Sequence, residues 1–227
     1  MENKHPKVYI HTKIGKIAVY HHFANSDKTP IIFLHGVYFD HHLWDAVIES
    51  IKDPHLSDLC LKMVGKNGKH RAEYIKAPAA KGMHHAYPGG LLEHSLEVFD
   101  YCMSDIDLIN RHSYASLNAD LLISAALLHD IGKIQEYVVT DVIDDKTYYA
   151  FTETGKMIGH LCLSAMWVYS EIEKIQGFPH DLQEHLSHIL LSHHGRVEWG
   201  AAILPKTKEA EFFHMADHRS ATIAKGY

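Results

Sequence analysis

The sequence is poor in cysteine, has no long apolar run and carries no excess of positive charge. Its three cysteines, Cys60, Cys102 and Cys162, fall in apolar segments without paired spacing, which predicts buried free thiols in a reducing compartment. No early apolar stretch resembles a signal peptide, and no run approaches the roughly 20 apolar residues that a membrane span needs. We therefore expect a cytoplasmic protein that has no membrane partner.

The formal net charge of −6 argues against a large basic surface for duplex nucleic acid. Non-specific affinity for nucleic acid comes mainly from Lys and Arg side chains on phosphates. A metal site or one small basic groove can still attract the end of a single strand. With 227 residues and a hydrophobic content of 46%, the chain can bury a proper core, and we expect one or two domains. Assembly into a homo-oligomer is left open.

Histidine, by contrast, is abundant, with 22 residues. The most informative segment is Leu-Leu-His-Asp-Ile-Gly-Lys, in which His129 and Asp130 follow the apolar run of residues 121–128. Burying an imidazole or a carboxylate unpaired costs several kcal/mol, and a bound metal ion removes that cost by taking both as ligands. Gly132 can end the helix, and Lys133 then places an ammonium one turn from the carboxylate, where a phosphate can lie.

Other ligand-type side chains stand next to apolar residues at helical spacing, so each is expected to point from a helix toward the interior. These residues are His94, His160, His193, His194 and Asp217. Ligand-type groups at the apolar edges of several helical segments are hard to explain without a metal, because unpaired they would be costly to bury.

The order His…His-Asp…Asp, with further histidines between, resembles the HD superfamily of metal-dependent phosphohydrolases. Two longer strings resemble the HD domain of bacterial 3′→5′ exoribonucleases: Pro-Ala-Ala-Lys-Gly-Met-His-His-Ala-Tyr-Pro-Gly-Gly-Leu-Leu-Glu-His and Leu-Ser-His-His-Gly-Arg-Val-Glu-Trp-Gly. Pro205, followed by Thr207, Glu209 and Ala210, adds to this resemblance, which runs from about residue 54 to the end. Domains that accompany conjugative relaxases carry a similar Gly-Gly-Leu-Leu-Glu-His-Ser segment, so that segment alone does not separate the two groups.

The resemblance implies two adjoining metal positions. The ligands of the metal common to all HD proteins correspond to His94, His129, Asp130 and Asp217. The ligands of the second metal in two-metal members correspond to His160, His193 and His194, with Asp130 bridging. Imidazole and carboxylate ligands suit Mn²⁺, Fe²⁺, Zn²⁺ or Ni²⁺, with Mg²⁺ less favoured. Two such ions about 3.5–4 Å apart can activate a water and clamp the phosphate oxygens of an in-line displacement.

Five residues are predicted to act on the substrate or in catalysis. Asp130 and Lys133 are the predicted catalytic residues, the lysine because its place in the motif lets it neutralise a phosphate. Arg196 is a second candidate for that role, with a solvated side chain as the alternative. Trp199, in a polar setting, is the best candidate to stack on a base. His85 lies close to the ligand motif and is predicted either to bind substrate or to make structural hydrogen bonds.

Residues 1–53 differ from the rest and are expected to form a short β-containing appendage. The pattern predicts a helix from about 42 to 51 and strands at 8–10, 17–20 and 31–34. Pro-Ile-Ile-Phe-Leu-His-Gly-Val, with Trp44 downstream, resembles the opening of an α/β-hydrolase, but the chain has no Gly-x-Ser-x-Gly elbow. We interpret this segment as an appendage or a fusion relic. The exoribonucleases carry an oligonucleotide-binding β-barrel at this place, and the segment is too short to form one.

From residue 54 onward the pattern is helical. The predicted fold class is therefore mainly α, an HD-domain helical bundle of residues 54–227 with a small β hairpin, preceded by the short β-containing segment. Helices are expected at about 56–74 (one or two), 90–106, 119–131, 155–175, 181–193 and 207–217, with a hairpin over 136–151. Asn118 and Thr207 are predicted helix caps. Leu92, Leu96, Val98 and Phe99 are predicted core residues.

Two classes of function remain open. The first is an enzyme, a metal-dependent phosphodiesterase or phosphohydrolase that trims single-stranded RNA or DNA from its 3′ end. A smaller nucleotide or cyclic nucleotide is the competing substrate. The second class is a non-catalytic module that uses the metal site to sense nucleotides or to hold a partner. The full ligand set and Lys133 favour the enzyme, because a site without chemistry has no need of all seven ligands.

Overall fold

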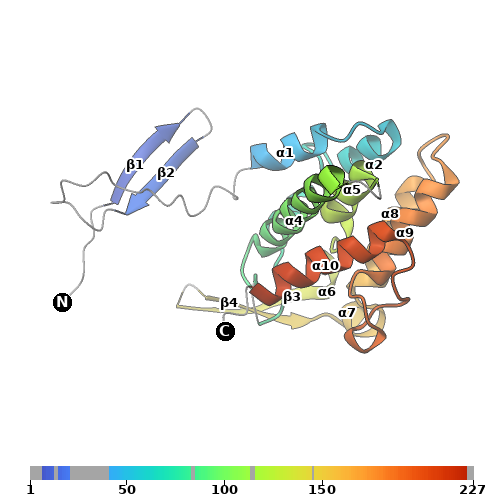
Figure 1. The fold of residues 1–227 in the computed structure, drawn as a ribbon. Helices are drawn as coiled ribbons and strands as arrows, with labels where there is room; N and C mark the ends of the chain where they lie inside the picture. The colour runs from blue at the N-terminus through green and yellow to red at the C-terminus, as the bar shows by residue number, and fades with distance from the viewer. Residues whose placement is uncertain are drawn as a thin grey trace.

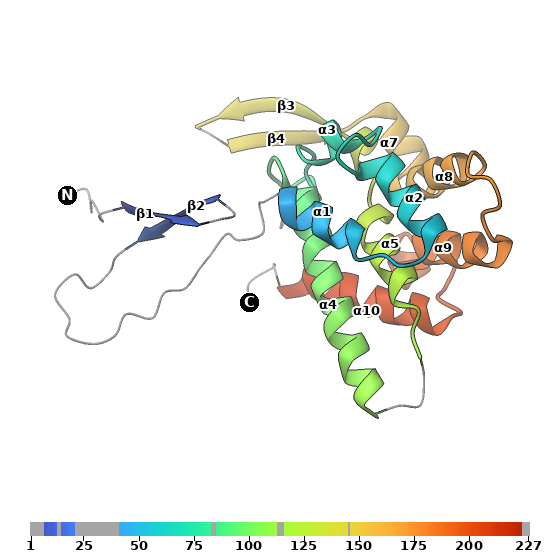
Figure 2. The same cartoon turned by 90° about the horizontal axis from the view of Figure 1, so that it is seen from above.

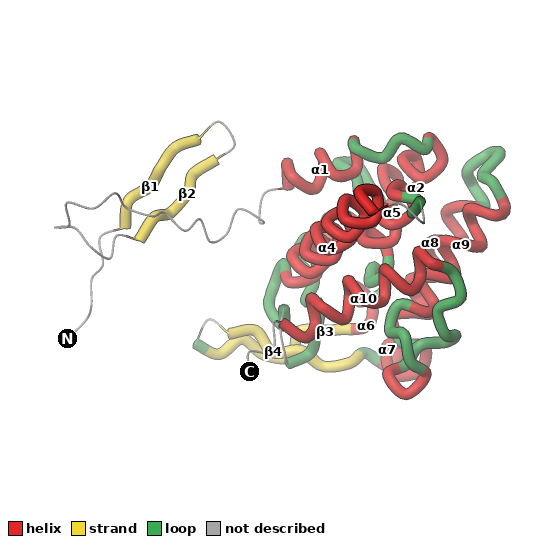
Figure 3. Tube along the Cα trace, in the orientation of Figure 1, coloured by secondary structure: helices red, strands yellow, loops and turns green. Residues whose placement is uncertain are grey.

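The computed structural model describes residues 7–12, 15–20, 41–82, 85–112, 116–144 and 146–223. This part of the chain is mainly helical and contains two separate two-stranded antiparallel sheets (Figures 1 and 3). The mainly α class predicted from the sequence is confirmed. No helix within the described ranges is both long and apolar enough to cross a membrane.

The first sheet lies near the start of the chain. Strand β1 (Lys7–Thr12) pairs with β2 (Gly15–Tyr20), so that Lys7 stands opposite Tyr20. The predicted strands at 8–10 and 17–20 are thus confirmed, whereas the strand predicted at 31–34 lies outside the described residues.

The helices and the second sheet follow in the order that the sequence pattern predicts. The first helices are α1 (His41–Glu49), α2 (Pro54–Val64), α3 (Arg71–Tyr74), α4 (Gly90–His112) and α5 (Ala119–Leu128). Next come α6 (Lys133–Glu136), β3 (Tyr137–Ile143), β4 (Lys146–Phe151), α7 (Glu153–Ile158) and α8 (His160–Ile172). The last elements are α9 (His180–Ser192), the 3₁₀ turn η2 (Val197–Trp199) and α10 (Lys208–Ile223).

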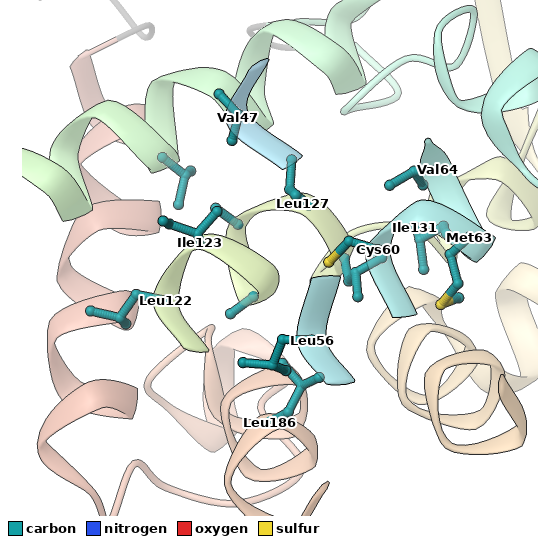
Figure 4. Close-up of a cluster of buried hydrophobic side chains, with 14 of the residues drawn as sticks. Val47, Leu56, Cys60, Met63, Val64, Leu122, Ile123, Leu127, Ile131 and Leu186 are labelled. Atoms are coloured by element: carbon teal, nitrogen blue, oxygen red, sulfur yellow. The ribbon is translucent and has the colours of Figure 1, made fainter. Parts of the chain in front are cut away.

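Helix α5 is the centre of the bundle. It contacts α1, α2, α4, α9 and α10, and all eight residues from Leu121 to Leu128 are buried. A helix surrounded in this way needs no polar face, which is why residues 121–128 are apolar apart from Ser124, whose hydroxyl donates a hydrogen bond to the Asp120 carbonyl at 2.8 Å. Figure 4 shows Leu122, Ile123 and Leu127 among the buried side chains of neighbouring helices. The predicted cap is confirmed, because the Asn118 side chain accepts a hydrogen bond from the Leu121 backbone N–H at 3.0 Å.

The other helices pack around α5 as neighbouring pairs. Helix α10 runs beside α4, and α8 lies beside α9 (Figures 1 and 2). Both α4 and α10 extend several residues beyond their predicted ends. Thr207 caps α10, because its hydroxyl accepts a hydrogen bond from the Ala210 N–H at 3.1 Å. The predicted core residues of α4 behave as expected: Leu92, Leu96 and Val98 are buried, and Phe99 packs against the core while partly buried.

Helix α1 packs into the same core although it precedes the predicted domain boundary at residue 53. Its Trp44 and Ile48 are each 1% exposed, and the Trp44 indole donates a hydrogen bond to the Val64 carbonyl at 3.0 Å. Asp53 and Pro54 then start α2, with the Asp53 carboxylate accepting hydrogen bonds from the next backbone N–H groups. The boundary itself stays a prediction.

Two further predicted helix bounds are wrong, in addition to the ends of α4 and α10. Helix α5 ends at Leu128 and not at residue 131, because the chain turns there to bring Gly132 against the start of α8. A Cβ atom on Gly132 would lie only 2.5 Å from the His160 carbonyl oxygen. The single helix predicted over 155–175 is two helices, α7 and α8, separated at Gly159. Gly159 has a φ of 74°, a left-handed value that ends a helix.

The predicted hairpin over 136–151 is confirmed as β3 and β4. Tyr137 pairs with Phe151 and Ile143 with Lys146, with a register irregularity between Val139 and Asp141. Strand β3 follows α6 directly and β4 leads into α7, so the hairpin connects the two short helices that flank the cluster described next.

Candidate metal centre

The seven predicted ligand residues converge from helices α4, α8 and α10 and from the turns that directly follow α5 and α9. Their nitrogen and oxygen atoms form overlapping groups in which all ligand atoms lie within 4.8 Å of one another. The first ligand group is His94, His129 and Asp217, and the second ligand group is His160, His193 and His194. A third set, His129, Asp130 and His193, overlaps both, so that Asp130 lies between the two groups.

The first ligand group gathers around the Oδ2 side of Asp130. His94 Nε2 lies 3.1 Å from Asp217 Oδ1 and 3.4 Å from Asp130 Oδ2. His129 Nε2 lies 3.3 Å from the same Asp130 oxygen and 3.7 Å from Asp217 Oδ1. Two imidazoles and two carboxylates therefore face one small volume, which is a donor set that suits a divalent cation.

The second ligand group faces the other oxygen of Asp130. His160 Nε2 lies 3.3 Å from Asp130 Oδ1, and His193 Nε2 lies 3.7 Å from it. Asp130 is 1% exposed, and its Oδ1 has no hydrogen-bond partner among the described residues. A buried carboxylate oxygen without a donor is costly. A cation shared with the histidines would satisfy it, so the residues present fit two adjoining divalent ions.

The imidazoles are oriented with their Nε2 atoms toward the centre. The Nδ1 atoms of three of them donate hydrogen bonds of 2.8–3.1 Å to backbone carbonyls, namely His129 to Ala126, His193 to Leu190 and His194 to Trp199. A neutral imidazole carries a single N–H. With that proton on Nδ1, each Nε2 presents a lone pair to the centre, as a metal ligand must.

Two pairs of ring nitrogens face each other across the centre. The Nε2 atoms of His94 and His129 are 3.2 Å apart, and those of His160 and His194 are 3.3 Å apart. Burial and the neighbouring His193 and His160 lower the pKa of His194 to about 3, so this ring stays neutral at neutral pH. When the His160 ring is neutral as well, the lone pairs of these two Nε2 atoms oppose and repel each other, and a cation between them removes the repulsion.

The carboxylates at the centre are held charged. Burial opposes ionisation of Asp130, but the neighbouring Lys133 and His129 outweigh it and hold the pKa of this carboxyl well below its usual range. His94 likewise outweighs burial and lowers the pKa of Asp217. Burial lowers the pKa of His94, yet Asp130 and Asp217 reverse this effect and raise it to about 9. Binding of a metal at His94 must therefore displace a proton.

A pocket of about 300 Å³ opens over this cluster. Five of the predicted ligands line it, namely His94, Asp130, His160, His194 and Asp217. The other polar and aromatic side chains of its wall are Lys133, Tyr137, Trp199 and His218. A volume at the small end of the range for ligand pockets accommodates a nucleotide-sized group.

The predicted catalytic and substrate-binding residues lie at different distances from the centre. Lys133 lines the pocket with its Nζ 2.5 Å from Asp130 Oδ2. Trp199 lines the pocket and is 45% exposed, and the Arg196 guanidinium lies over its ring at 4.7 Å. His85 is buried, with Nε2 3.3 Å from a carboxylate oxygen of Glu97. Neither Arg196 nor His85 lines the pocket, and all these roles stay predictions.

The sequence reasoning missed several polar residues that contact the predicted ligands. Glu136 contacts His160, Ser220 contacts His94, and Glu97 contacts Ser220. A signal for two of them was present, because Glu97 follows His94, and Ser220 follows Asp217, by three residues. On a helix such pairs share one face.

Comparison with known proteins gave two kinds of match. The model of the HD domain family matches residues 91–222. The 3'-5' exoribonuclease YhaM of Bacillus licheniformis is 33% identical over 184 residues, which is 80% of this chain and 54% of the relative. The protein of that name from Bacillus subtilis is 32% identical over 174 residues, 77% of this chain and 51% of the relative. The chain thus spans about half the length of these curated relatives. No solved structure gave a significant match.

Proposed function

The chain belongs to the HD superfamily of metal-dependent phosphohydrolases, and from this premise we propose that it is a phosphodiesterase that removes nucleotides from the 3′ end of single-stranded nucleic acid. The observation that carries the proposal is the position of Asp130, whose two oxygens face two separate groups of histidines at the floor of a pocket. The relatives, which bear the name 3'-5' exoribonuclease, support the direction of cleavage.

The metal positions belong to the proposal. The first would be held by His94, His129, Asp130 and Asp217, and the second by His160, His193, His194 and Asp130. When bound, divalent ions supply Lewis-acid polarisation of a phosphoryl group and activation of water. The choice among Mn²⁺, Fe²⁺, Zn²⁺ and Ni²⁺ stays open, since imidazole and carboxylate ligands suit each of them.

Lys133 would bring a positive charge to the substrate phosphate. Its side chain is 11% exposed and lies at the pocket wall, next to the carboxylate at the floor. A fixed cation in a partly dry site stabilises negative charge that develops on phosphoryl oxygens during displacement. Lys133 is therefore assigned a role in the chemical step.

Trp199 would hold the base of the terminal nucleotide. Its ring stacks with His218 at 5.0 Å and 15°, and both rings line the pocket. Because the Arg196 guanidinium lies over the same ring at 4.7 Å, a base would stack on Trp199 by taking the place of Arg196, and such stacking gains about 1–3 kcal/mol with little sequence preference. Arg196, which lies over Trp199, would then act at the pocket mouth and not at the reacting phosphate.

A smaller substrate is the second candidate. The chain spans about half the length of the curated relatives that it matches. The pocket of about 300 Å³ is large enough for a mononucleotide. A nucleotide or cyclic-nucleotide phosphohydrolase would use the same ligands and the same Lys133.

The proposal is tested with the purified full chain in Mn²⁺. Three substrates are compared: a 3′-end-labelled single strand, the matching duplex, and bis-p-nitrophenyl phosphate. We expect the 3′ label to be released from the single strand as a mononucleotide, because the terminal nucleotide is the first to be removed. Asp130→Asn should abolish cleavage and reduce bound metal. The matched control is Asp120→Asn at the start of α5, whose carboxylate accepts hydrogen bonds from the backbone of residues 52 and 53.

Each of the other outcomes has a defined meaning. Internal cleavage of the duplex at the rate of single-strand shortening would overturn the exonuclease proposal. Hydrolysis of only the small ester or of mononucleotides would replace it with the second candidate. Metal binding without any cleavage would favour a non-catalytic module.

A further inference from the structure

We propose that two carboxylates outside the predicted ligand set, Glu136 and Glu97, position one histidine in each ligand group and set the metal affinity of the two positions separately. Glu136 acts directly on His160, and Glu97 acts on His94 through the hydroxyl of Ser220. This inference rests on the metal positions of the proposed function. It adds two positioning residues and one relay residue to them.

Glu136 holds both the ring and the backbone of His160. Its Oε1 lies 2.9 Å from His160 Nδ1 and 3.0 Å from the His160 backbone N. The break at Gly159 makes His160 the first residue of α8, and the first N–H groups of a helix have no partner within it. One carboxylate oxygen thus accepts both donors of the same residue. The ring cannot rotate away from the centre without losing that hydrogen bond.

The position of Glu136 is itself fixed. The side chain is 5% exposed, and the Glu136 carbonyl accepts a hydrogen bond from the Thr152 N–H at 2.9 Å. Gly155 packs directly against this residue, because a Cβ there would lie 2.5 Å from the Glu136 carbonyl oxygen. The carboxylate is therefore a rigid support behind His160, on the side of the ring opposite to the Nε2 that faces Asp130.

Glu97 reaches His94 through Ser220. Ser220 Oγ lies 3.0 Å from His94 Nδ1 and donates its own proton to Glu97 Oε2 at 2.7 Å. A hydroxyl has one proton, and since the carboxylate accepts it, the serine oxygen must accept the N–H of His94. The direction of both hydrogen bonds is thus determined. Nε2 of His94 is left to face the first ligand group, and Ser220 is 1% exposed, so water does not replace it.

The other three histidines have a different kind of support. His129, His193 and His194 donate from Nδ1 to backbone carbonyls, which are neutral and which no substitution removes. Among the described residues, one histidine in each ligand group therefore has a carboxylate behind its Nδ1. His160 contacts Glu136 directly, and His94 contacts Glu97 through Ser220. A carboxylate behind a ligating imidazole fixes the ring and raises its basicity, and its loss typically weakens metal binding about 10–100-fold.

The test measures Mn²⁺ binding to metal-free full-length protein by equilibrium dialysis, with no activity assay. We expect Glu136→Gln to weaken one of two Mn²⁺ positions about 10–100-fold, and Ser220→Ala and Glu97→Gln to weaken the other by a similar factor. Position is assigned in a His194→Ala background, which removes a ligand of the second group alone. There Ser220→Ala should still weaken the remaining ion, and Glu136→Gln should leave it unchanged.

Two control variants have matched chemistry. Ser192→Ala removes a buried hydroxyl that bonds only to the carbonyl of His188 in its own helix, at 2.6 Å. Glu209→Gln changes a buried carboxylate that accepts the Asn118 N–H at 3.1 Å. Both should leave Mn²⁺ binding unchanged. Thermal unfolding of every metal-free variant shows whether the fold is retained.

The outcomes separate this inference from the function on which it rests. Wild-type protein that binds no divalent ion would overturn both. Two Mn²⁺ positions in the wild type, with unchanged affinity in folded Glu136→Gln and Ser220→Ala, would overturn the positioning inference alone. Equal weakening in the two control variants would also overturn it, because the effect would then come from general loosening of the core.

Discussion

Lys133 and the metal positions share one carboxylate. The ammonium lies 2.5 Å from Asp130 Oδ2, the oxygen that the first ligand group also faces. Without a metal, this ion pair neutralises part of the buried negative charge. In the proposed reaction the same ammonium lies at the pocket wall, where a phosphoryl oxygen can take the place of the carboxylate as its partner.

We predict that Lys133→Ala lowers kcat about 100-fold, a typical loss for one group that stabilises transition-state charge. The rise in KM should be smaller, because the ammonium acts mainly on charge that develops during displacement. Steady-state kinetics with the single strand measure both quantities. The control is Lys156→Ala, which removes an exposed lysine that pairs with Glu153. A large rise in KM with unchanged kcat would assign Lys133 to ground-state binding instead.

For single residues, the sequence predicted members of the candidate site wherever a polar residue type stands in an apolar segment. His129 and Asp130 follow an apolar run, and His193 and His194 also stand next to apolar residues. Polar groups in such positions are unusual, which is why the sequence could predict them as ligands. The structure places all seven predicted ligands close together. Glu136 gave no such signal, because a glutamate at the end of a helix is ordinary on a surface. Only the fold, which brings α6 beside the start of α8, shows that Glu136 is buried against His160.

Two glycines, Gly132 and Gly159, allow the start of α8 to lie at the candidate metal centre, and each does so for a different reason. Gly132 lies where the chain after α5 touches the start of α8, with no room for a side chain. Gly159 has open space around it and is required for its left-handed φ alone. The sequence pattern placed a single helix across Gly159, because the apolar periodicity continues on both sides of it. The periodicity of apolar side chains carries no information on the sign of φ, so it could not predict this break.

We predict that Gly132→Ala destabilises the protein by about 1–3 kcal/mol, as overpacking does, and also weakens Mn²⁺ binding. The added Cβ would meet backbone and Cβ atoms of α8 at 2.5–2.9 Å, so α8 must shift and His160 with it. Gly159→Ala is the matched variant: it should cost about 1–3 kcal/mol through backbone strain at a φ of 74° and ψ of 155°, with a smaller effect on Mn²⁺ binding. Urea unfolding and Mn²⁺ dialysis measure the two quantities. Unchanged Mn²⁺ binding in Gly132→Ala would contradict this account.

Across the whole molecule, the core extends further toward the N-terminus than the predicted boundary at residue 53. Buried apolar residues occur in α1 and just after it at the spacing i, i+3, i+4 and i+7, namely Trp44, Val47, Ile48 and Ile51. This spacing is typical of a helix with one buried face, and it was visible in the sequence. We propose that the helical domain begins at α1.

The last prediction follows from this proposal. Trp44→Ala should lower the free energy of unfolding by about 3–5 kcal/mol, the usual cost of removing a large buried aromatic side chain. The variant also loses the indole hydrogen bond to Val64 and the ring contact with Tyr74, whose centroid is 5.0 Å away. Urea unfolding of the full chain measures the change. Glu49→Ala, at an exposed site on the same helix, should stay within about 0.5 kcal/mol of the wild type. A Trp44→Ala protein as stable as the wild type would mean that α1 does not belong to the cooperative unit, and the domain would then begin at α2, where the sequence pattern first placed it.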